Sequence, residues 1–223
     1  VVIASFKSKR YVYGYIENAP FDTLIGSEVY GSNKAIIERF TALADIEAIY
    51  KKYDNIDALL NAFQNNSIDL FLNNTVKSGY DLNGYVTTSA YDTTLVVISK
   101  ASVNENINSI NALKNQNVAI LKNSYIKSLL GNVTEYDTIE KLVKSKANII
   151  VLDYQNYEYY KNSKFENYKI DYIYNLNEGY GFTLKSVTDN KIFNEYFDFY
   201  LKLMPQNSVA VSGIGELVSK TNF

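Results

Sequence analysis

Two apolar segments of the chain are alike, and each ends in a polar side chain that could bind a ligand. Residues 68–73 read IDLFLN and residues 148–153 read NIIVLD, so the segments end in Asn73 and Asp153. An amide or a carboxylate at the end of a buried strand can hydrogen-bond a small molecule, and a partly desolvated carboxylate needs a cationic or hydrogen-bonding partner. The chemistry that these positions predict is the binding of a polar ligand.

The composition argues against catalysis, because the 223-residue chain has no His and no Cys. Ser-His-Asp and Cys-His nucleophile systems are excluded, and so are zinc sites built on His or Cys. The sequence also has no Gly-rich phosphate loop and no nucleophile elbow. Glu17 and Asp153 could form a carboxylate pair for glycoside hydrolysis, but nothing in the sequence sets their separation. We therefore expect a protein that is not an enzyme, with no cofactor and no metal.

The segments before Asn73 predict alternating strands and helices. Residues 11–16 (YVYGYI) favour a strand, residues 33–43 have helical spacing, and residues 45–50 favour a second strand. A second helix follows, with Asp54 or Asn55 as its N-cap. One face of this helix is apolar: Ile56, Leu59, Leu60 and Phe63.

The end of this helix and the next strand can also be predicted. Residues 65–67 (NNS) stop the helix, since these side chains favour turns. Residues 68–72 then form a strand that is apolar on both faces except at Asp69, as is typical of parallel strands covered by helices. A helix that leads into a buried strand is half of a βαβ crossover.

The same pattern recurs, which predicts a second α/β unit. Residues 138–153 (TIEKLVKSKANIIVLD) repeat the helix and strand, and residues 118–130 repeat the preceding strand, loop and helix. Strands at 93–100 and 179–185 would cross from the first unit to the second and back. Such crossings predict a hinge, and a cleft at the carboxyl ends of the parallel strands, where open α/β sheets bind ligands.

The two crossings predict a mainly parallel α/β protein with two lobes, each flanked by helices. Lobe 1 is discontinuous, with residues 1–95 and 186–223, and lobe 2 has residues 96–185. A helical pattern near the C-terminus would pack on lobe 1, through Ile192, Phe193, Tyr196, Phe199, Tyr200 and Leu203.

The charge distribution argues against a nucleic-acid partner, and the hydropathy argues against a membrane-spanning segment in this sequence. The net charge is −2 with Lys, Asp and Glu interspersed, so we expect no nucleic acid. No apolar run reaches the roughly 18–20 residues needed to span a bilayer. The Tyr-rich stretch 154–174 could stack on a sugar or base, but such residues more often pack an outer helix.

Four stretches, in their order and spacing, resemble one known family. They are VYGYIENAPFD (12–22), NIDALLNAFQNNSIDLFL (55–72), SINALKNQNVAILKNSY (109–125) and IIVLDYQNYEYY (149–160). Together they resemble the family 3 extracellular solute-binding proteins, which have the type II periplasmic-binding fold. In the third stretch Asn replaces the family's glycines. The resemblance implies binding of a polar amino acid between two lobes.

The resemblance implies that lobe 2 binds both charged groups of such a ligand, the ammonium group and the carboxylate. Asp153 matches the acidic residue that receives the ligand's ammonium group. Ser124 and Tyr125 match a turn whose backbone N–H groups, at a helix N-terminus, hold the ligand's carboxylate.

The resemblance also implies ligand contacts in lobe 1. Asn73 and Asn74 match polar positions that hydrogen-bond the ligand. Tyr15 and Asn18 fall where the family has aromatic and acidic pocket residues, and Ile56 falls where an aromatic ring often covers the ligand.

One position departs from the family in a way that changes the expected ligand. The family binds the ligand's carboxylate with an Arg after the first-lobe strand, and Asp81 stands there in this chain. Arg10 and Arg39 lie elsewhere, and Lys77 is a point charge rather than a planar fork. An Asp would repel a carboxylate, so an amine or another cationic ligand becomes the expectation, or a degenerate pocket.

The resemblance implies where the protein acts and two possible roles for it after the ligand has bound. The protein would act at the extracellular or periplasmic face of a bacterial membrane, anchored there in the full-length protein. It would deliver solute to a membrane permease, or act as a sensor domain that signals through its own transmembrane segment to a kinase or diguanylate cyclase. A lobe pair used only for protein contact is the remaining alternative.

Overall fold

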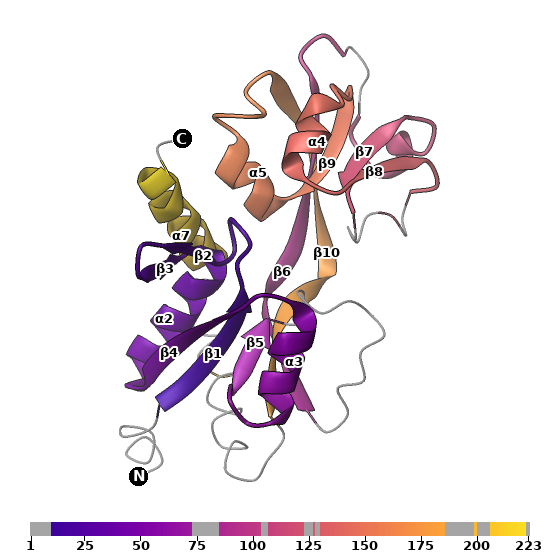
Figure 1. The fold of residues 1–223 in the computed structure, drawn as a ribbon. Coiled ribbons are helices and arrows are strands. Elements are labelled where there is room, and N and C mark those ends of the chain that lie inside the picture. The colour runs from indigo at the N-terminus through magenta and orange to yellow at the C-terminus, as the bar shows by residue number, and fades with distance from the viewer. Residues whose placement is uncertain are drawn as a thin grey trace. The chain divides into compact units, whose positions relative to one another are not determined.

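The computed structural model describes residues 10–72, 85–103, 107–122, 127, 130–185, 199 and 206–221, and only the backbone for residues 85–93, 176–185 and 206. The chain divides into two compact units (Figure 1). Unit 1 contains Val1–Asp92 and Gly179–Asn222, and unit 2 contains Thr93–Glu178.

Strand β1 (Arg10–Ile16) is the centre of unit 1. It pairs in parallel with β4 (Glu47–Tyr53) on one side and with β5 (Leu70–Leu72) on the other. Strand β10 (Tyr168–Lys185) continues the sheet, antiparallel to β5. The short strands β2 (Thr23–Ile25) and β3 (Glu28–Tyr30) form a separate hairpin, which the sequence pattern does not predict.

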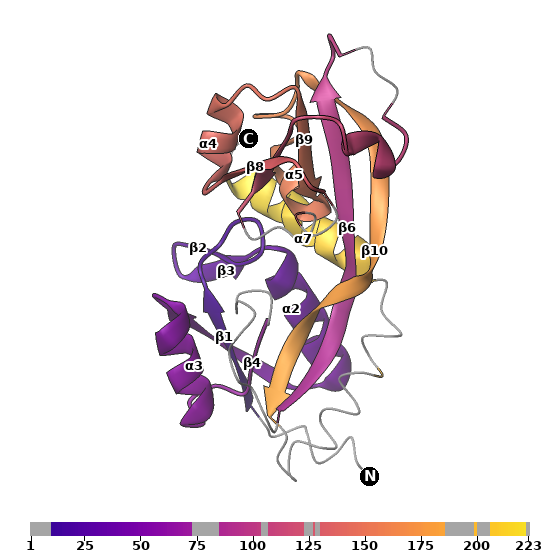
Figure 2. The same cartoon turned by 90° about the vertical axis from the view of Figure 1, so that its right-hand side faces the viewer.

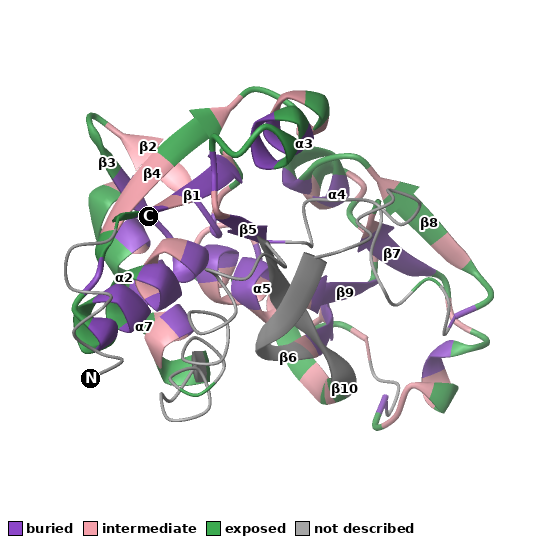
Figure 3. Ribbon diagram, turned by 90° about the horizontal axis from the view of Figure 1, so that it is seen from below, coloured by how far each residue is buried: buried purple, intermediate pink, exposed green. Residues whose placement is uncertain are grey.

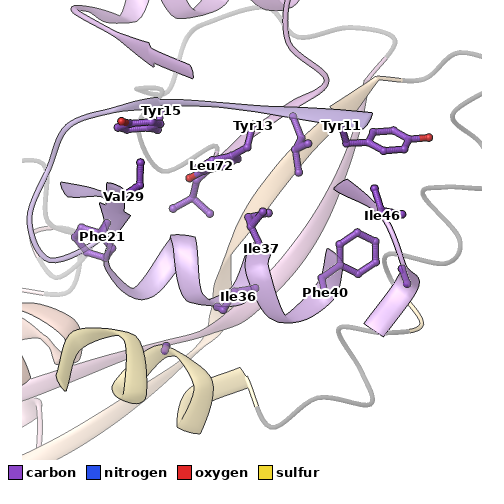
Figure 4. Close-up of a cluster of buried hydrophobic side chains, with 13 residues drawn as sticks. Tyr11, Tyr13, Tyr15, Phe21, Val29, Ile36, Ile37, Phe40, Ile46 and Leu72 are labelled. Carbon is purple, nitrogen blue, oxygen red and sulfur yellow. The ribbon is translucent and has the colours of Figure 1, made fainter. Parts of the chain in front are cut away.

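Helix α2 (Ser32–Ala44) covers one face of this sheet. Side chains alternate between the two faces of a strand, so Tyr11, Tyr13 and Tyr15 of β1 all belong to the face of the sheet that α2 covers (Figure 4). They pack there against Ile36, Ile37 and Phe40, which are spaced to lie on one helix face. Full burial of one such side chain contributes roughly 1.5–3 kcal/mol.

Helix α3 (Ile56–Gln64) covers the opposite face. Leu59 and Phe63 pack there with Ile68 and Phe71, and the rings of Phe63 and Phe71 meet edge to face with centroids 5.0 Å apart. Asn55 is the N-cap, because its side chain accepts the N–H of Ala58 at 2.9 Å. The predicted elements of residues 11–72 are thereby confirmed.

The C-terminal helix α7 (Gln206–Thr221) packs on α2 within unit 1. A Cβ at Gly213 would lie 2.6 Å from the Cβ of Ala35 and 2.6 Å from the carbonyl oxygen of Gly31, so glycine permits this close approach. The predicted helical pattern at 192–203 lies outside the described residues except for Phe199.

Unit 2 repeats the arrangement around β7 (Val118–Leu121). This strand pairs in parallel with β8 (Val133–Tyr136) and with β9 (Ile149–Asp153), and β9 is antiparallel to β6 (Tyr85–Lys100). Strands β7 and β9 are almost wholly buried, as β5 is in unit 1 (Figure 3). Among the described residues of this unit, the helices are α4 (Ile139–Lys144) and α5 (Tyr154–Tyr160), with the 3-10 turn η2 (Asn111–Leu113).

Strands β6 and β10 each contribute to both units (Figure 2). They have 16 and 18 residues, and as neighbours they join the strands of both units into one ladder, β4-β1-β5-β10-β6-β9-β7-β8. The expected fold class, α/β with mainly parallel strands, flanking helices and two crossings, is confirmed.

Candidate functional site

The structure describes four of the ten predicted site residues: Tyr15, Asn18, Ile56 and Asp153. The other six lie outside the described residues: Asn73, Asn74, Lys77, Asp81, Ser124 and Tyr125. Their predicted roles stay predictions.

Tyr15, Asn18 and Ile56 all lie near the carboxyl ends of two adjacent parallel strands in unit 1. Strands β1 and β4 end in register, with Ile16 opposite Tyr53. Tyr15 and Asn18 stand at the end of β1, and Ile56 begins the helix that follows β4. This edge of a parallel sheet is where open α/β folds bind ligands.

Tyr15 is part of the core between the sheet and α2. It is 3% exposed, and its ring stacks on that of Tyr13 with centroids 6.3 Å apart. Burial raises the pKa of the Tyr15 hydroxyl, and the nearby carboxylates of Asp22 and Glu17 raise it further. Tyr15 therefore stays neutral and offers a hydroxyl rather than a charge.

Asn18 starts a tight loop and holds it through its backbone. Its N–H donates to the carbonyl of Asp22 at 2.7 Å, and its carbonyl accepts the N–H groups of Phe21 and Asp22 at 2.8 and 3.0 Å. The residue itself is exposed. Ile56 is half-buried against the core under α3.

Asp153 ends β9 and caps α5. Its Oδ2 accepts the backbone N–H of Asn156 at 2.9 Å, and its Oδ1 accepts the side-chain amide of Asn156 at 2.7 Å. Burial raises the pKa of Asp153, while these hydrogen bonds from Asn156 act in the opposite direction. A carboxylate has about four lone-pair sites, so the half-buried Asp153 keeps acceptor capacity beyond the cap.

Sequence reasoning missed a buried carboxyl group, Asp22. It is 3% exposed, and its Oδ2 accepts the Tyr13 hydroxyl at 2.9 Å and the Asn33 amide at 3.1 Å. Burial raises the pKa of Asp22 to about 7, although both hydrogen bonds lower it. No local pattern marks this position, because a lone Asp after Pro20 and Phe21 reads as a turn residue at the surface.

Glu17 and the Tyr-rich stretch 154–174, which the sequence offered for other roles, make contacts within their own units. Glu17 accepts the N–H of Leu24 at 3.2 Å and pairs with Lys52 at 3.3 Å. In the Tyr-rich stretch, Tyr159 and Tyr160 are buried and meet edge to face with centroids 4.6 Å apart. The tyrosines of α5 therefore pack their helix rather than presenting a row of exposed rings.

The described residues offer neither a metal site nor a membrane span. Within them, no group of three or more His, Cys, Asp or Glu side chains is placed to hold a metal ion. No helix in the described part of the chain has the length and apolarity that crossing a bilayer requires.

Comparison by sequence alone finds no relative: no family model matches the chain, and no curated protein sequence does. Comparison by structure finds several similar proteins. The unliganded, open L-cystine solute receptor of Neisseria gonorrhoeae superposes with a TM-score of 0.71 at 14% identity, over 96% of this chain and 97% of that one.

Two further structures extend the likeness. The GluR0 ligand-binding core in complex with L-glutamate gives a TM-score of 0.66 at 16% identity, over 93% of this chain and 99% of that one. The substrate-binding protein AbpA of an amino acid ABC transporter from Streptococcus pneumoniae, bound to L-arginine, gives 0.59 at 17% identity, over 96% of each chain. The protein thus has the two-lobed type II periplasmic-binding fold, as its resemblance to the family 3 solute-binding proteins predicted.

Proposed function

We propose that this chain is a non-catalytic, extracytoplasmic binding domain for a small polar solute, an amino acid or an amine. Its mechanism would be closure of the two lobes, with the closed population raised by the ligand. The fold supports this proposal, as do the similar structures, which are a receptor for L-cystine, a ligand-binding core in complex with L-glutamate and a substrate-binding protein bound to L-arginine.

The observation that carries the proposal is the geometry of Asp153. A carboxylate that ends a buried strand, is half-buried, and is held in place by Asn156 is preorganised to receive an ammonium group. The hydrogen bonds from Asn156 fix the direction of the carboxylate, so a ligand does not have to order it. An acidic group in this setting favours a ligand with a protonated amine.

The rest of the predicted pocket refines the ligand class. Asp81 stands where the family has Arg, and Lys77 is the nearest cation in the sequence. A ligand carboxylate would meet repulsion from Asp81, while an amine or diamine would meet two acidic groups, Asp81 and Asp153. We therefore expect amines to bind more tightly than standard amino acids.

A thermal-shift panel of amines, amino acids, peptides and sugars tests the binding function. A true ligand at about 100 times its Kd adds roughly 2.7 kcal/mol, or roughly 5–11 °C in Tm for a chain of this size. The variant Asp153→Asn should lose this shift while it keeps an N-cap, because Asn also caps helices. Glu166→Gln removes an exposed carboxylate in the same unit and should keep the shift.

Two results would contradict the proposal. If no compound of the panel raises the Tm, the alternative in which the lobe pair serves only protein contact is favoured. An unchanged ligand shift in Asp153→Asn would remove Asp153 from the site. The output is a separate question that the full-length gene answers: transmembrane segments and a signalling domain indicate a sensor, and a lipoprotein signal indicates a receptor that delivers solute to a permease.

A further inference from the structure

The loop Glu17–Asp22 is attached to the rest of unit 1 at its C-terminal end. The carbonyl groups of Pro20 and Phe21 accept the N–H groups of Ser32 and Asn33, both at 3.0 Å. These N–H groups belong to the first turn of α2, which has no side-chain cap because Gly31 occupies the N-cap position. The loop therefore supplies the cap that α2 lacks.

Asp22 adds the side-chain part of this attachment. Its Oδ2 joins the Tyr13 hydroxyl of β1 to the Asn33 amide of α2, so one carboxyl group ties the loop to both elements. Its other oxygen, Oδ1, has no hydrogen-bond partner in the part of the chain that the structure describes. Asp22 Oδ1, Thr23 Oγ1 and Ser32 Oγ are all buried, and no described residue hydrogen-bonds them.

No described cation forms an ion pair with Asp22. The Tyr13 hydroxyl donates to Asp22. Burial raises the pKa of Tyr15 and Tyr50, and both lie close enough to Asp22 for its carboxylate to raise their pKa further. The charged and titratable groups of the surrounding loop, helices and hairpin are mostly paired with one another: Glu17 with Lys52, Lys34 with Glu38, and Glu28 with Tyr30, with Lys220 over the Tyr30 ring.

A buried carboxylate without a counter-charge is costly, whereas a carboxylic acid at the same place is not. Ionisation of Asp22 must therefore favour any state in which the loop detaches and the carboxylate reaches water. Backbone hydrogen bonds join Asn18, at the start of this loop, to Asp22, so Asn18 would move with the loop.

We propose that Asp22 is a positioning residue that holds the Asn18 loop on α2 while it carries a proton, and that loss of this proton loosens the loop. Through Asn18, acid would favour the binding-competent form of unit 1 and alkali would weaken it. This effect on ligand binding rests on the proposed function. The loosening of the loop does not.

Hydrogen exchange of the full chain, followed by NMR without any ligand, tests the proposal. The backbone N–H groups of Ser32 and Asn33 report the loop–helix contact, because both donate to the loop. Their protection, corrected for the intrinsic pH dependence of exchange, should fall roughly tenfold between pH 5.5 and 8.5. The N–H of Asp69, which donates to Val12 at 2.9 Å, serves as the reference in the same unit.

Variants separate the proton from the general stability of unit 1. Asp22→Asn keeps an acceptor for Tyr13 and Asn33 but cannot ionise, so the protection of Ser32 and Asn33 should no longer depend on pH. Asp57→Asn removes an exposed carboxylate in α3 and should behave like the wild type.

The proposal fails if wild-type protection does not change with pH, or if Asp22→Asn shows the same fall. If Asp22→Asn does not fold, carbon-13 NMR of the wild-type Asp22 carboxyl group decides. Its midpoint should coincide with that of the loss of protection, near pH 7. A midpoint below pH 5 would overturn the proposal even if a ligand had been found by thermal shift.

Discussion

At the scale of single residues, the carboxyl groups of the half-buried Asp153 and the buried Asp22 lie in different environments. Asp153 accepts one hydrogen bond as the N-cap of α5 and one from the Asn156 side chain. These bonds orient its carboxylate at the end of β9. Asp22 bonds only donors that are neutral, Tyr13 and Asn33, and one of its oxygens has no partner among the described residues. The arrangement at Asp153 favours binding of a ligand ammonium group, and the arrangement at Asp22 favours a protonated, neutral carboxyl group.

These two groups predict a pH dependence of folding. The pKa of Asp22 rises from its ordinary value of 3.8 to about 7 in the folded chain, and the pKa of Asp153 is raised as well. Between about pH 4 and 7 the unfolded chain therefore binds fewer protons than the folded chain, so this contribution to the free energy of unfolding falls as pH rises. The limit is about 1.4 kcal/mol per pH unit for each group.

Urea unfolding followed by circular dichroism measures this effect. The difference in stability between Asp22→Asn and the wild type should be smallest at pH 4.5, because Asp22 then still carries its proton in the folded chain. As pH rises to 7.5 the variant should become the more stable of the two, by a difference that grows steadily. A constant difference at all pH values would show that Asp22 does not hold its proton in the folded chain.

At the scale of elements, the caps explain where the helices begin. The sequence allowed Asp54 or Asn55 as N-cap of α3, and the structure selects Asn55, whose Oδ1 accepts the Ala58 N–H. Thr138 does the same for α4 by accepting the Lys141 N–H at 3.2 Å. The repeated helix–strand pattern of the sequence therefore has matching caps in both units.

Replacement of the α3 cap should destabilise unit 1. Asn55→Ala leaves the Ala58 N–H without its side-chain partner, so we expect a loss of about 1 kcal/mol in the free energy of unfolding. Asp54→Ala changes the exposed neighbour and should stay within about 0.5 kcal/mol of the wild type. Urea unfolding of both variants checks this assignment, and equal losses would contradict it.

At the scale of the whole molecule, segments far apart in sequence complete unit 1. Helix α7 packs on α2, and β10 pairs with β5, although each of these pairs joins an early segment to a late one. The core of unit 1 is therefore complete only when the segments that precede and follow unit 2 in the sequence are both in place. Strands β6 and β10 are the two connections, as the sequence predicted from residues 93–100 and 179–185.

Two glycines of α7 test this long-range packing. Gly213→Ala would place a Cβ against the Gly31 carbonyl and Ala35, so the helices must move apart, and we expect a loss of about 1–3 kcal/mol. Gly215→Ala meets nothing within 4 Å, so the better helix propensity of Ala should stabilise the chain by about 0.5–1 kcal/mol. Thermal unfolding should move in opposite directions for the two variants. A loss for both would show that α7 does not dock on α2 as described.

The sequence by itself determined the fold class, the helices α2, α3 and α4, the two crossing strands and the position of Asp153 at the end of β9. These features follow from local periodicity, from turn residues such as Asn65 to Ser67, and from a pattern that occurs twice, all of which can be read along the chain. Only the tertiary structure decided that Asp22 is buried, that Gly213 lets α7 approach α2, and that Asn156 orients Asp153. The first two depend on contacts between segments that are far apart in sequence, because the burial of a residue is set by the element that packs on it. The third is a local contact over three residues, but whether the Asn156 side chain folds back on Asp153 is set by the conformation of the helix start.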